Sequence, residues 1–310
     1  MVSLSSAFVF PSAAVQAGDP SPSLSAWMRS ALSLDGAGSM SSAASPEGAG
    51  ILRLSPTLSQ LTQWLRQAQQ RLIRHRAALE PGVPEVLYVA TSLDAETLGT
   101  GFALMGDCEM ARCYWQRACQ YGLQPLRMAQ ERPDDDPVLI QGTTACDVLR
   151  LVVCALAAGD RDLQEEILQQ YPTCPLRLTR QVPVLDGMAD SILQAMAACL
   201  AGYADIARQV LQLGMGQLPE DPALSGCYQG LVNMAWALLG ILNQDQDTFN
   251  AGLMGQLAVH YQWALCSGRD EEEAYICLSA LAMVNLGLQC GLEQQVFDLL
   301  IPQGLICQTG

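Results

Sequence analysis

The sequence contains no lysine, and this absence sets its charge. All 16 basic residues are arginines and stand against 31 acidic residues, so the formal net charge is −15 at pH 7. A field of this sign repels nucleic acids and anionic lipid surfaces and attracts basic protein surfaces. We therefore expect no nucleic acid and no membrane among the partners of this protein, whereas a basic protein partner fits the composition.

Histidine is scarce as well, since only His75 and His260 occur. Two histidines and no lysine leave few groups for acid–base catalysis near neutral pH, and they make a Cys/His metal site improbable. The chain also lacks a Gly-x-Ser-x-Gly nucleophile motif, a phosphate-binding P-loop and a Gly-x-Gly-x-x-Gly motif after a strand. The sequence thus predicts a protein that is not an enzyme and that carries no metal or other cofactor.

The twelve cysteines follow no metal-binding or redox spacing. Cys108, Cys113 and Cys119 are spaced five and six residues apart, unlike a zinc knuckle or a CxxC pair. Most of the others lie in apolar helical runs, where a free thiol behaves as a small hydrophobic group. Reduced core cysteines and a cytoplasmic location are expected, with no required disulfide. The cysteines in apolar helical runs are Cys154, Cys199, Cys227, Cys277 and Cys290.

Long hydrophobic runs are missing too. No apolar stretch reaches the length and purity of a membrane span. The short apolar run near the start follows no Arg or Lys and is interrupted by Pro11, which is unlike a secretory signal. Residues 1–50 are rich in Ser, Ala and Gly and are expected to be flexible. Helical patterning begins at Ser55-Pro56, a predicted N-cap and first helical position, and we expect one helical domain over residues 51–310.

A recurring unit runs through this domain. An apolar helical run ends in Gly or Asn, a short polar turn follows, usually with an Asp, and a second helical run begins. Glycine takes the left-handed conformation after a helix, and the Asp caps the next helix. Such short turns make neighbouring helices antiparallel. The prediction is an all-α fold, an irregular array of antiparallel helical hairpins with solenoid-like packing of the tetratricopeptide or HEAT type. The breaks are Gly106, Gly159, Gly202, Asn243 and Gly291.

The most apolar part of the chain is residues 240–292. Its pattern predicts a long helix that carries Phe249 and His260 on one face, and then a break at Ser267-Gly268. The following helix, over residues 271–290, is apolar nearly all round. A helix without a polar face is covered on several sides, so we expect this one to be the centre of the fold.

Three features allow both a structural and a functional interpretation. The basic segment of residues 66–76 could bind an anion, but in so acidic a chain we favour an outer helix that pairs with the protein's own acids. His260 could mark a site, but a half-buried packing histidine is favoured. Gly252 and Gly255 are expected to allow a close helix contact rather than to cradle a phosphate.

Two acidic runs are the candidate partner-binding residues. The first lies in a loop bracketed by Pro133 and Pro137, so it is expected to be exposed, and helix capping does not easily explain it. The second opens the predicted helix of residues 271–290, where the positive end of the helix also accounts for it. Loops on a rigid scaffold commonly carry binding residues. The candidates are Asp134, Asp135 and Asp136 in the first run, and Asp270, Glu271, Glu272 and Glu273 in the second.

Residues 235–305 also resemble a known family. They contain a helix, the turn GILNQDQDTF, the helical segment GLMGQLAVHY, the run SGRDEEEAYICLSALAMVNLGLQCGLE and the ending LLIPQGLI. This order of features is similar to the C-terminal half of immunity protein family forty-nine of bacterial polymorphic toxin systems. Residues 104–122 and 149–171 fit its earlier hairpins loosely. The resemblance implies an all-helical protein that neutralises a toxin by binding it, with no catalytic residues.

We therefore expect an immunity protein that occludes its cognate toxin stoichiometrically, with an acidic face against a basic toxin surface. The alternative is a tetratricopeptide-like adaptor or secretion chaperone that binds a partner peptide in a groove, and a helical enzyme is the third possibility. A groove lined by aromatic or Asn side chains would favour the adaptor, and a deep pocket with two convergent carboxylates would favour the enzyme. The identity of the toxin, the binding face and the oligomeric state stay open.

Overall fold

The computed structural model describes residues 56–80, 84–131, 143–171, 183–216, 225–266 and 272–307. Within these ranges all regular secondary structure is helical, which confirms the predicted all-α fold class. Residues 1–50, predicted to be flexible, lie outside the described ranges. None of the helices within them is long and apolar enough to cross a membrane.

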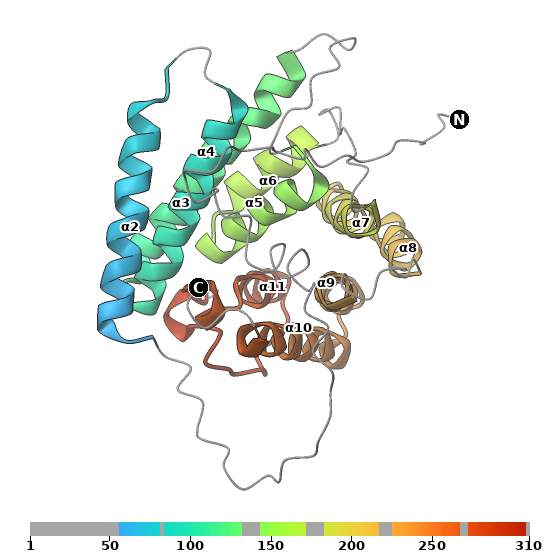
Figure 1. Cartoon of the computed structure of the whole chain (residues 1–310). Coiled ribbons are helices and arrows are strands. Elements are labelled where there is room, and N and C mark those ends of the chain that lie inside the picture. Colours follow the sequence, from blue (N-terminus) through green and yellow to red (C-terminus); the bar gives the residue numbers. More distant parts are fainter. Residues whose placement is uncertain are drawn as a thin grey trace, which may run out of the picture.

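The helices follow one another in hairpins, and Figure 1 shows them side by side in three groups. α2, α3 and α4 form one side, α5 to α8 cross the middle, and α9 to α11 form the lower part. The elements are α2 (Leu58–Ala77), α3 (Glu85–Leu104), α4 (Cys108–Glu131), α5 (Ala145–Ala158), α6 (Arg161–Gln170), α7 (Pro183–Leu200), α8 (Ala204–Met215), α9 (Ser225–Asn243), α10 (Gln246–Cys266), the 3-10 helix η3 (Glu272–Tyr275), α11 (Leu278–Gln289) and the 3-10 helix η4 (Gln303–Leu305).

The predicted helix breaks are present in the structure. Four of them are glycines with positive φ, between 72° and 88°, where the absence of a Cβ makes the left-handed conformation accessible. At Gly159, the next amide, from Asp160, donates to the Ala155 carbonyl at 3.0 Å and closes the helix end. The fifth break differs by one residue, because Gln244 and not Asn243 takes the positive φ of 53°. The four glycines are Gly106, Gly159, Gly202 and Gly291.

Most turn aspartates cap the next helix as predicted, but one does not. Asp160 Oδ1 accepts the Leu163 N–H at 3.0 Å, and Asp245 Oδ1 accepts the Thr248 N–H at 3.2 Å. The exception is Asp205, because the N-cap of α8 is Tyr203 and the Asp205 carboxylate pairs with Arg208 instead.

The first described helix also begins later than predicted. Thr57, and not Ser55, is its N-cap, and the Thr57 and Gln60 side chains each bond the other residue's backbone N–H in a capping box. This reciprocal pair satisfies two free donors at once, which favours the start at Leu58.

α5 is the most enclosed helix. All of its residues except Asp147 and Arg150 are buried, and it packs against α4, α6, α7 and α11. α11, which the sequence predicts as the centre, is buried along residues 280–285 and shares the core with α5. The centre of the fold is therefore the contact between two helices that are far apart in the chain.

α11 is also shorter than predicted, and the acidic run does not cap it. In place of the predicted helix of residues 271–290, the structure has η3, a break of two non-helical residues and then α11 from Leu278. The Cys277 N–H donates to the Leu300 carbonyl at 2.9 Å, outside any helix, so the C-terminal segment interrupts the helical ladder at this point. The expectation that Asp270 to Glu273 open this helix at its positive end is wrong.

Asn285 fastens the contact between α5 and α11. Its Nδ2 donates to the Leu156 carbonyl at 2.9 Å, and its Oδ1 accepts the Cys307 N–H at 2.9 Å. In a strict solenoid each unit contacts only its neighbours. The contact between α5 and α11 goes beyond that pattern, and solenoid-like packing of the whole array stays a prediction.

The close approach of α9 and α10 explains the paired glycines. A Cβ added to Gly252 would lie 2.4 Å from the Ala237 backbone nitrogen, and one added to Gly255 would meet the Asn233 side chain at 2.5 Å. Gly252 and Gly255 are thus contact residues between helices, as predicted.

Candidate functional site

The sequence-predicted binding residues fall mostly outside the described ranges. Asp134, Asp135 and Asp136 lie in the segment 132–142, and Asp270 and Glu271 lie in the segment 267–271. Glu272 and Glu273 open η3. The second acidic run is therefore located in the structure only by the backbone of η3.

η3 joins three parts of the fold. It packs against α3 and α10, and the Tyr275 ring lies 6.0 Å from the Trp64 ring of α2. Two residues later, Cys277 is bonded to Leu300 of the C-terminal segment. The end of the second acidic run thus adjoins the segment 292–302.

That C-terminal segment contains a tightly bonded turn at Asp298. Its Oδ1 accepts the Tyr261 hydroxyl at 2.8 Å and the Leu300 N–H at 2.9 Å, and its carbonyl accepts the Ile301 N–H at 3.1 Å. Burial, together with the bond to Asp298, raises the pKa of Tyr261 to about 12, so the phenol stays a donor at neutral pH. Leu300 and Ile301 are buried and anchor the turn.

The same turn holds two large apolar side chains in solvent. Phe297 is 70 % exposed and Leu299 is 79 % exposed, on either side of the anchored Asp298. Leu265, 44 % exposed, lies one helical turn beyond Tyr261 on α10 and shares its face. We call Leu265, Phe297 and Leu299 the C-terminal apolar patch.

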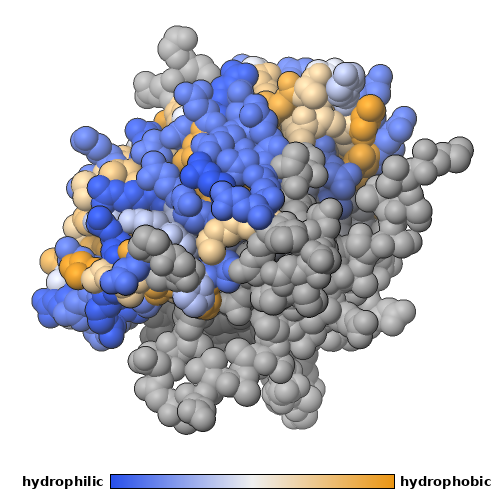
Figure 2. Space-filling model, turned by 90° about the horizontal axis from the view of Figure 1, so that it is seen from above, coloured by the Kyte–Doolittle hydropathy of each residue, from blue (hydrophilic) through white to orange (hydrophobic). Residues whose placement is uncertain are grey.

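The opposite end of the molecule presents a different surface. Figure 2 shows the face seen from above as mainly hydrophilic, with hydrophobic areas interrupted by polar residues. α10, α11 and the C-terminal segment lie at the lower end of Figure 1, away from that face.

A second feature lies close to the C-terminal apolar patch, where His260 of α10 meets Cys277 at the start of α11. His260 Nε2 lies 3.3 Å from the Ala274 carbonyl, which only accepts, so Nε2 carries a proton. The Cys277 sulfur lies 3.5 Å from the Ser279 hydroxyl, and Cys277 is the N-cap of α11. The predicted packing histidine is half-buried, but it has a thiol as a polar neighbour.

The two groups shift each other's ionisation. Burial opposes the charge on Cys277, but His260 and hydrogen bonds from His260, Ser279 and the Ala280 N–H together hold its pKa below the usual value. Burial likewise disfavours the imidazolium, yet the neighbouring Cys277 and the Ala274 carbonyl raise the pKa of His260. Both shifts favour a thiolate–imidazolium pair.

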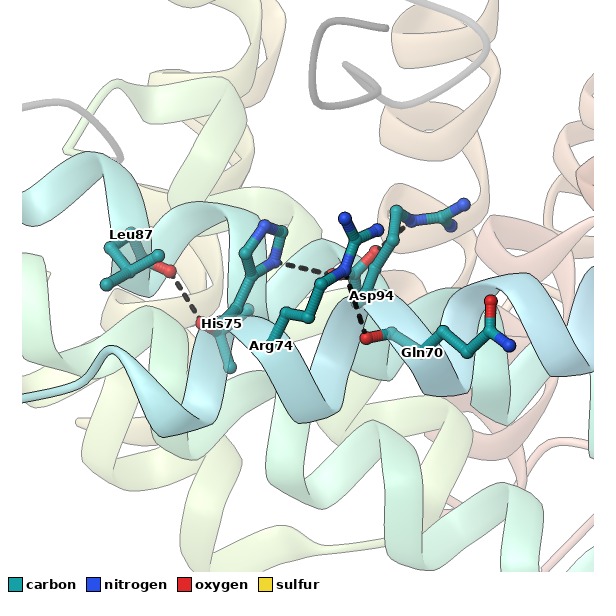
Figure 3. Close-up of polar contacts among 7 residues, drawn as sticks. Gln70, Arg74, His75, Leu87 and Asp94 are labelled. Carbon is teal, nitrogen blue, oxygen red and sulfur yellow. Dashed lines mark hydrogen bonds and ion pairs between the residues drawn. The ribbon is translucent and has the colours of Figure 1, made fainter. Parts of the chain in front are cut away.

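The basic segment of α2 is held by the protein's own acid, as predicted. Asp94 on α3 accepts Arg71 Nε at 2.6 Å and His75 Nδ1 at 2.7 Å (Figure 3). Arg74 turns back to the Gln70 carbonyl of its own helix. The buried Asp94 therefore clamps α2 onto α3, and this cluster has a structural explanation.

A buried ion pair inside the core was not predicted. Arg150 Nη1 donates to Glu96 Oε2 at 2.5 Å, and Arg150 Nη2 donates to the Ser92 hydroxyl at 3.2 Å. Burial lowers the pKa of Arg150, but the Glu96 carboxylate outweighs it and the net shift is upward. This pair joins α3 to α5.

No group of three or more His, Cys, Asp or Glu side chains in the described ranges is arranged to hold a metal ion. The cysteines whose side chains are described there form no disulfide with one another.

Comparison with models of known protein families, with curated proteins and with solved structures finds no match to this chain.

Sequence reasoning missed the C-terminal apolar patch and the His260–Cys277 pair. A signal for the patch is present, because Val-Phe-Asp-Leu-Leu-Ile places one acid within a run of large apolar residues before Pro302. The thiol and the imidazole are 17 positions apart and on different elements, and neither belongs to a recognisable motif.

Proposed function

We propose that this protein is a non-catalytic inhibitor that binds a basic protein partner stoichiometrically, in the manner of an immunity protein against a cognate toxin. The observation that carries the proposal is the C-terminal apolar patch, in which Phe297 and Leu299 are held in solvent by a hydrogen-bonded turn. Large apolar side chains fixed in place lose little entropy on binding and serve as interface anchors.

Charge supports a basic partner. The chain carries −15, and the second acidic run ends in Glu272 and Glu273 of η3, which is followed by the backbone bond from Cys277 to Leu300. An apolar centre bordered by acidic residues is suited to a basic surface, because apolar contact slows dissociation and opposite charge speeds encounter.

The proposal predicts that the adjacent reading frame encodes a protein with a toxic C-terminal domain. The test is co-expression with that domain, followed by binding kinetics on the purified pair. Protection is expected at one inhibitor per toxin. The double variant Phe297→Ala, Leu299→Ala should raise the dissociation rate about tenfold or more, as loss of interface anchors does. Leu213→Ala on α8 is the matched control, since Leu213 is 74 % exposed and lies outside the patch.

Each outcome is informative. Protection at clearly substoichiometric amounts would indicate turnover and reject the inhibitor role. An unchanged dissociation rate in the double variant would show that the C-terminal apolar patch is not part of the interface. Binding of an extended peptide from the partner, with no inhibition of the folded toxin, would favour the adaptor alternative.

A further inference from the structure

The helices α10 and α11 face each other in a register that can be read from their contacts. A Cβ added to Gly287 would meet the Phe249 ring at 2.5 Å, and at the other end His260 lies beside Ala274 and Cys277. Gln256 is seven residues after Phe249 and four before His260, so it shares their helix face. Its side chain is therefore on the face of α10 that lies against the first turns of α11.

Gln256 is an unusual residue for that place. It is only 3 % exposed, and neither its Oε1 nor its Nε2 has a hydrogen-bond partner among the described residues. A buried amide without partners destabilises the folded state, so each such group in a native protein requires an explanation, and a catalytic or redox role is one of the known ones. This amide therefore has unused donors and an unused acceptor on the helix face that carries His260.

The pair itself has the arrangement of an activated nucleophile. His260 is oriented by its Nε2–H bond to the Ala274 carbonyl, which leaves Nδ1 as the nitrogen that gains or loses a proton. Cys277 is the N-cap of α11, at the positive end of the helix, and its sulfur lies 3.5 Å from the Ser279 hydroxyl. A base held by a third group, next to a thiol at a helix N-terminus, is the general pattern of nucleophilic cysteines.

Other buried cysteines provide the contrast. Cys146 lies beside the Asp186 carboxylate, and Cys154 lies beside Cys119 and near Glu96, and in both cases burial and these neighbours raise the thiol pKa. Cys146, Cys154 and Cys277 are almost equally buried, at 1 %, 0 % and 2 % exposure. Burial alone therefore does not separate them, but their polar neighbours do.

We propose that Cys277, with His260 as its acid–base partner, is a selectively oxidised thiol that reacts with hydrogen peroxide to form a sulfenic acid, whose hydroxyl the Gln256 amide binds. Hydrogen peroxide suits the site because a thiol with so little exposed surface excludes bulkier electrophiles.

The reaction balances with groups at the site. The Cys277 thiolate attacks one peroxide oxygen, so an S–O bond forms and the O–O bond breaks. The imidazolium of His260 gives its proton to the leaving hydroxide, which departs as water. Sulfur is oxidised by two electrons and the peroxide is reduced by two.

Few other charged or ionisable groups face the pair in the described part of the chain. They are Tyr261 of α10 and Asp298 of the C-terminal segment, which bond each other. Asp298 supports the imidazolium electrostatically. The backbone bond from the Cys277 N–H to the Leu300 carbonyl also joins this residue to the turn that carries Phe297 and Leu299.

The test uses the purified full chain at pH 6, where an ordinary thiol is almost fully protonated. The folded protein is exposed to hydrogen peroxide and quenched with catalase. It is then unfolded in excess dimedone, which labels sulfenic acids, and every cysteine is quantified by peptide mass spectrometry. Cys277 should be oxidised at least tenfold faster than Cys146 and Cys154. Equal rates at the three positions would overturn the proposal and leave Cys277 as a structural helix cap.

Two variants separate the roles. His260→Gln should reduce the rate at pH 6 to that of Cys146, with folding checked by circular dichroism. Gln256→Met keeps the volume without the amide and should leave the first oxidation rate unchanged while shortening the lifetime of the sulfenic acid several-fold. A fast reaction at Cys277 in folded His260→Gln would contradict the assigned role of His260, and an unchanged lifetime in Gln256→Met would contradict that of Gln256.

Discussion

Substitution of Arg150 is expected to lower the stability of the protein strongly, because its charge is buried and is compensated by the Glu96 carboxylate. Breaking a buried pair by removing one partner typically destabilises a protein by about 3–5 kcal/mol, since the other charge is left uncompensated. We expect Arg150→Met to lower the free energy of unfolding by about 3 kcal/mol, measured by urea denaturation. The double variant Arg150→Met, Glu96→Leu should recover much of this loss.

An exposed pair is the matched control for that prediction. Arg127 and Glu166 lie 2.6 Å apart, but their side chains are 45 % and 41 % exposed. Solvent screens such pairs, so Arg127→Met should change the stability by less than about 1 kcal/mol. A loss at Arg150 as small as that at Arg127 would show that the buried pair tolerates an uncompensated carboxylate.

Single-residue roles were the hardest to predict from sequence. Glu96 and Arg150 are 54 positions apart, and both occupy helices whose remaining residues are mainly apolar. Local pattern indicates which face of a helix is buried, but the partner of a charged group across two helices depends on their register. Asp94 illustrates the same difficulty. The sequence predicted that an acid would pair with the basic segment of residues 66–76, but it did not indicate which acid.

At the scale of elements, the contact between α9 and α10 depends on glycine. Gly252→Ala would place a methyl group 2.4 Å from the Ala237 backbone nitrogen, so the two helices must separate. Overpacking of this kind typically costs about 1–3 kcal/mol, which more than offsets the better helix propensity of alanine. We expect a loss of about 2–3 kcal/mol by urea denaturation.

Gly202→Ala tests backbone strain without crowding. Nothing lies within 4 Å of a Cβ at Gly202, but its φ is +81°. The left-handed conformation costs an alanine roughly 1–2 kcal/mol, so this variant should lose less than Gly252→Ala. The reverse order would mean that α9 and α10 can adjust their spacing freely.

The turn between α9 and α10 gives a pH-dependent prediction. The Thr248 hydroxyl and N–H donate to Asp245 and hold its pKa below the usual value. A depressed folded pKa gives a stabilisation that is complete above the unfolded pKa, about 3.9, and is lost as pH falls through the folded pKa. Asp245→Asn keeps the N-cap but does not titrate. The stability difference between wild type and Asp245→Asn should therefore be constant above about pH 5 and change in favour of the variant below about pH 4. Urea denaturation between pH 3 and 7 measures it, and a difference that stays constant throughout would rule out this role for the carboxylate.

Elements were predicted well wherever the signal was local. The helix ends at Gly106, Gly159, Gly202 and Gly291 depend on a residue that tolerates positive φ, and this property is visible in the sequence. The start of α11 was wrong because a distant segment decides it, through the bond from Cys277 to Leu300.

At the scale of the whole molecule, net charge sets the kinetics of association. Replacement of Asp134, Asp135 and Asp136 by Asn changes the net charge from −15 by +3 to −12. Since opposite charges speed encounter and salt screens them, the triple variant should bind a basic toxin more slowly and with weaker salt dependence. The measurement is the association rate at two salt concentrations.

The second acidic run provides the comparison. Asp270→Asn with Glu271→Gln, Glu272→Gln and Glu273→Gln removes one more charge than the triple variant. Because this run does not cap α11, its neutralisation should leave the stability nearly unchanged and slow association more strongly than the loop variant. A faster or unchanged rate in both variants would exclude electrostatic steering by these two runs.

The contact between α5 and α11 also determines when the chain can finish folding. During synthesis, α5 emerges from the ribosome long before Asn285 and the helix that covers its Leu156 end. Until residues 278–307 have left the exit tunnel, the side of α5 that faces α11 has nothing of its own chain against it. The nascent protein must therefore hold an unfinished core until α11 has been made, and any premature stop before α11 would leave that surface permanently open to aggregation or to chaperones and proteases.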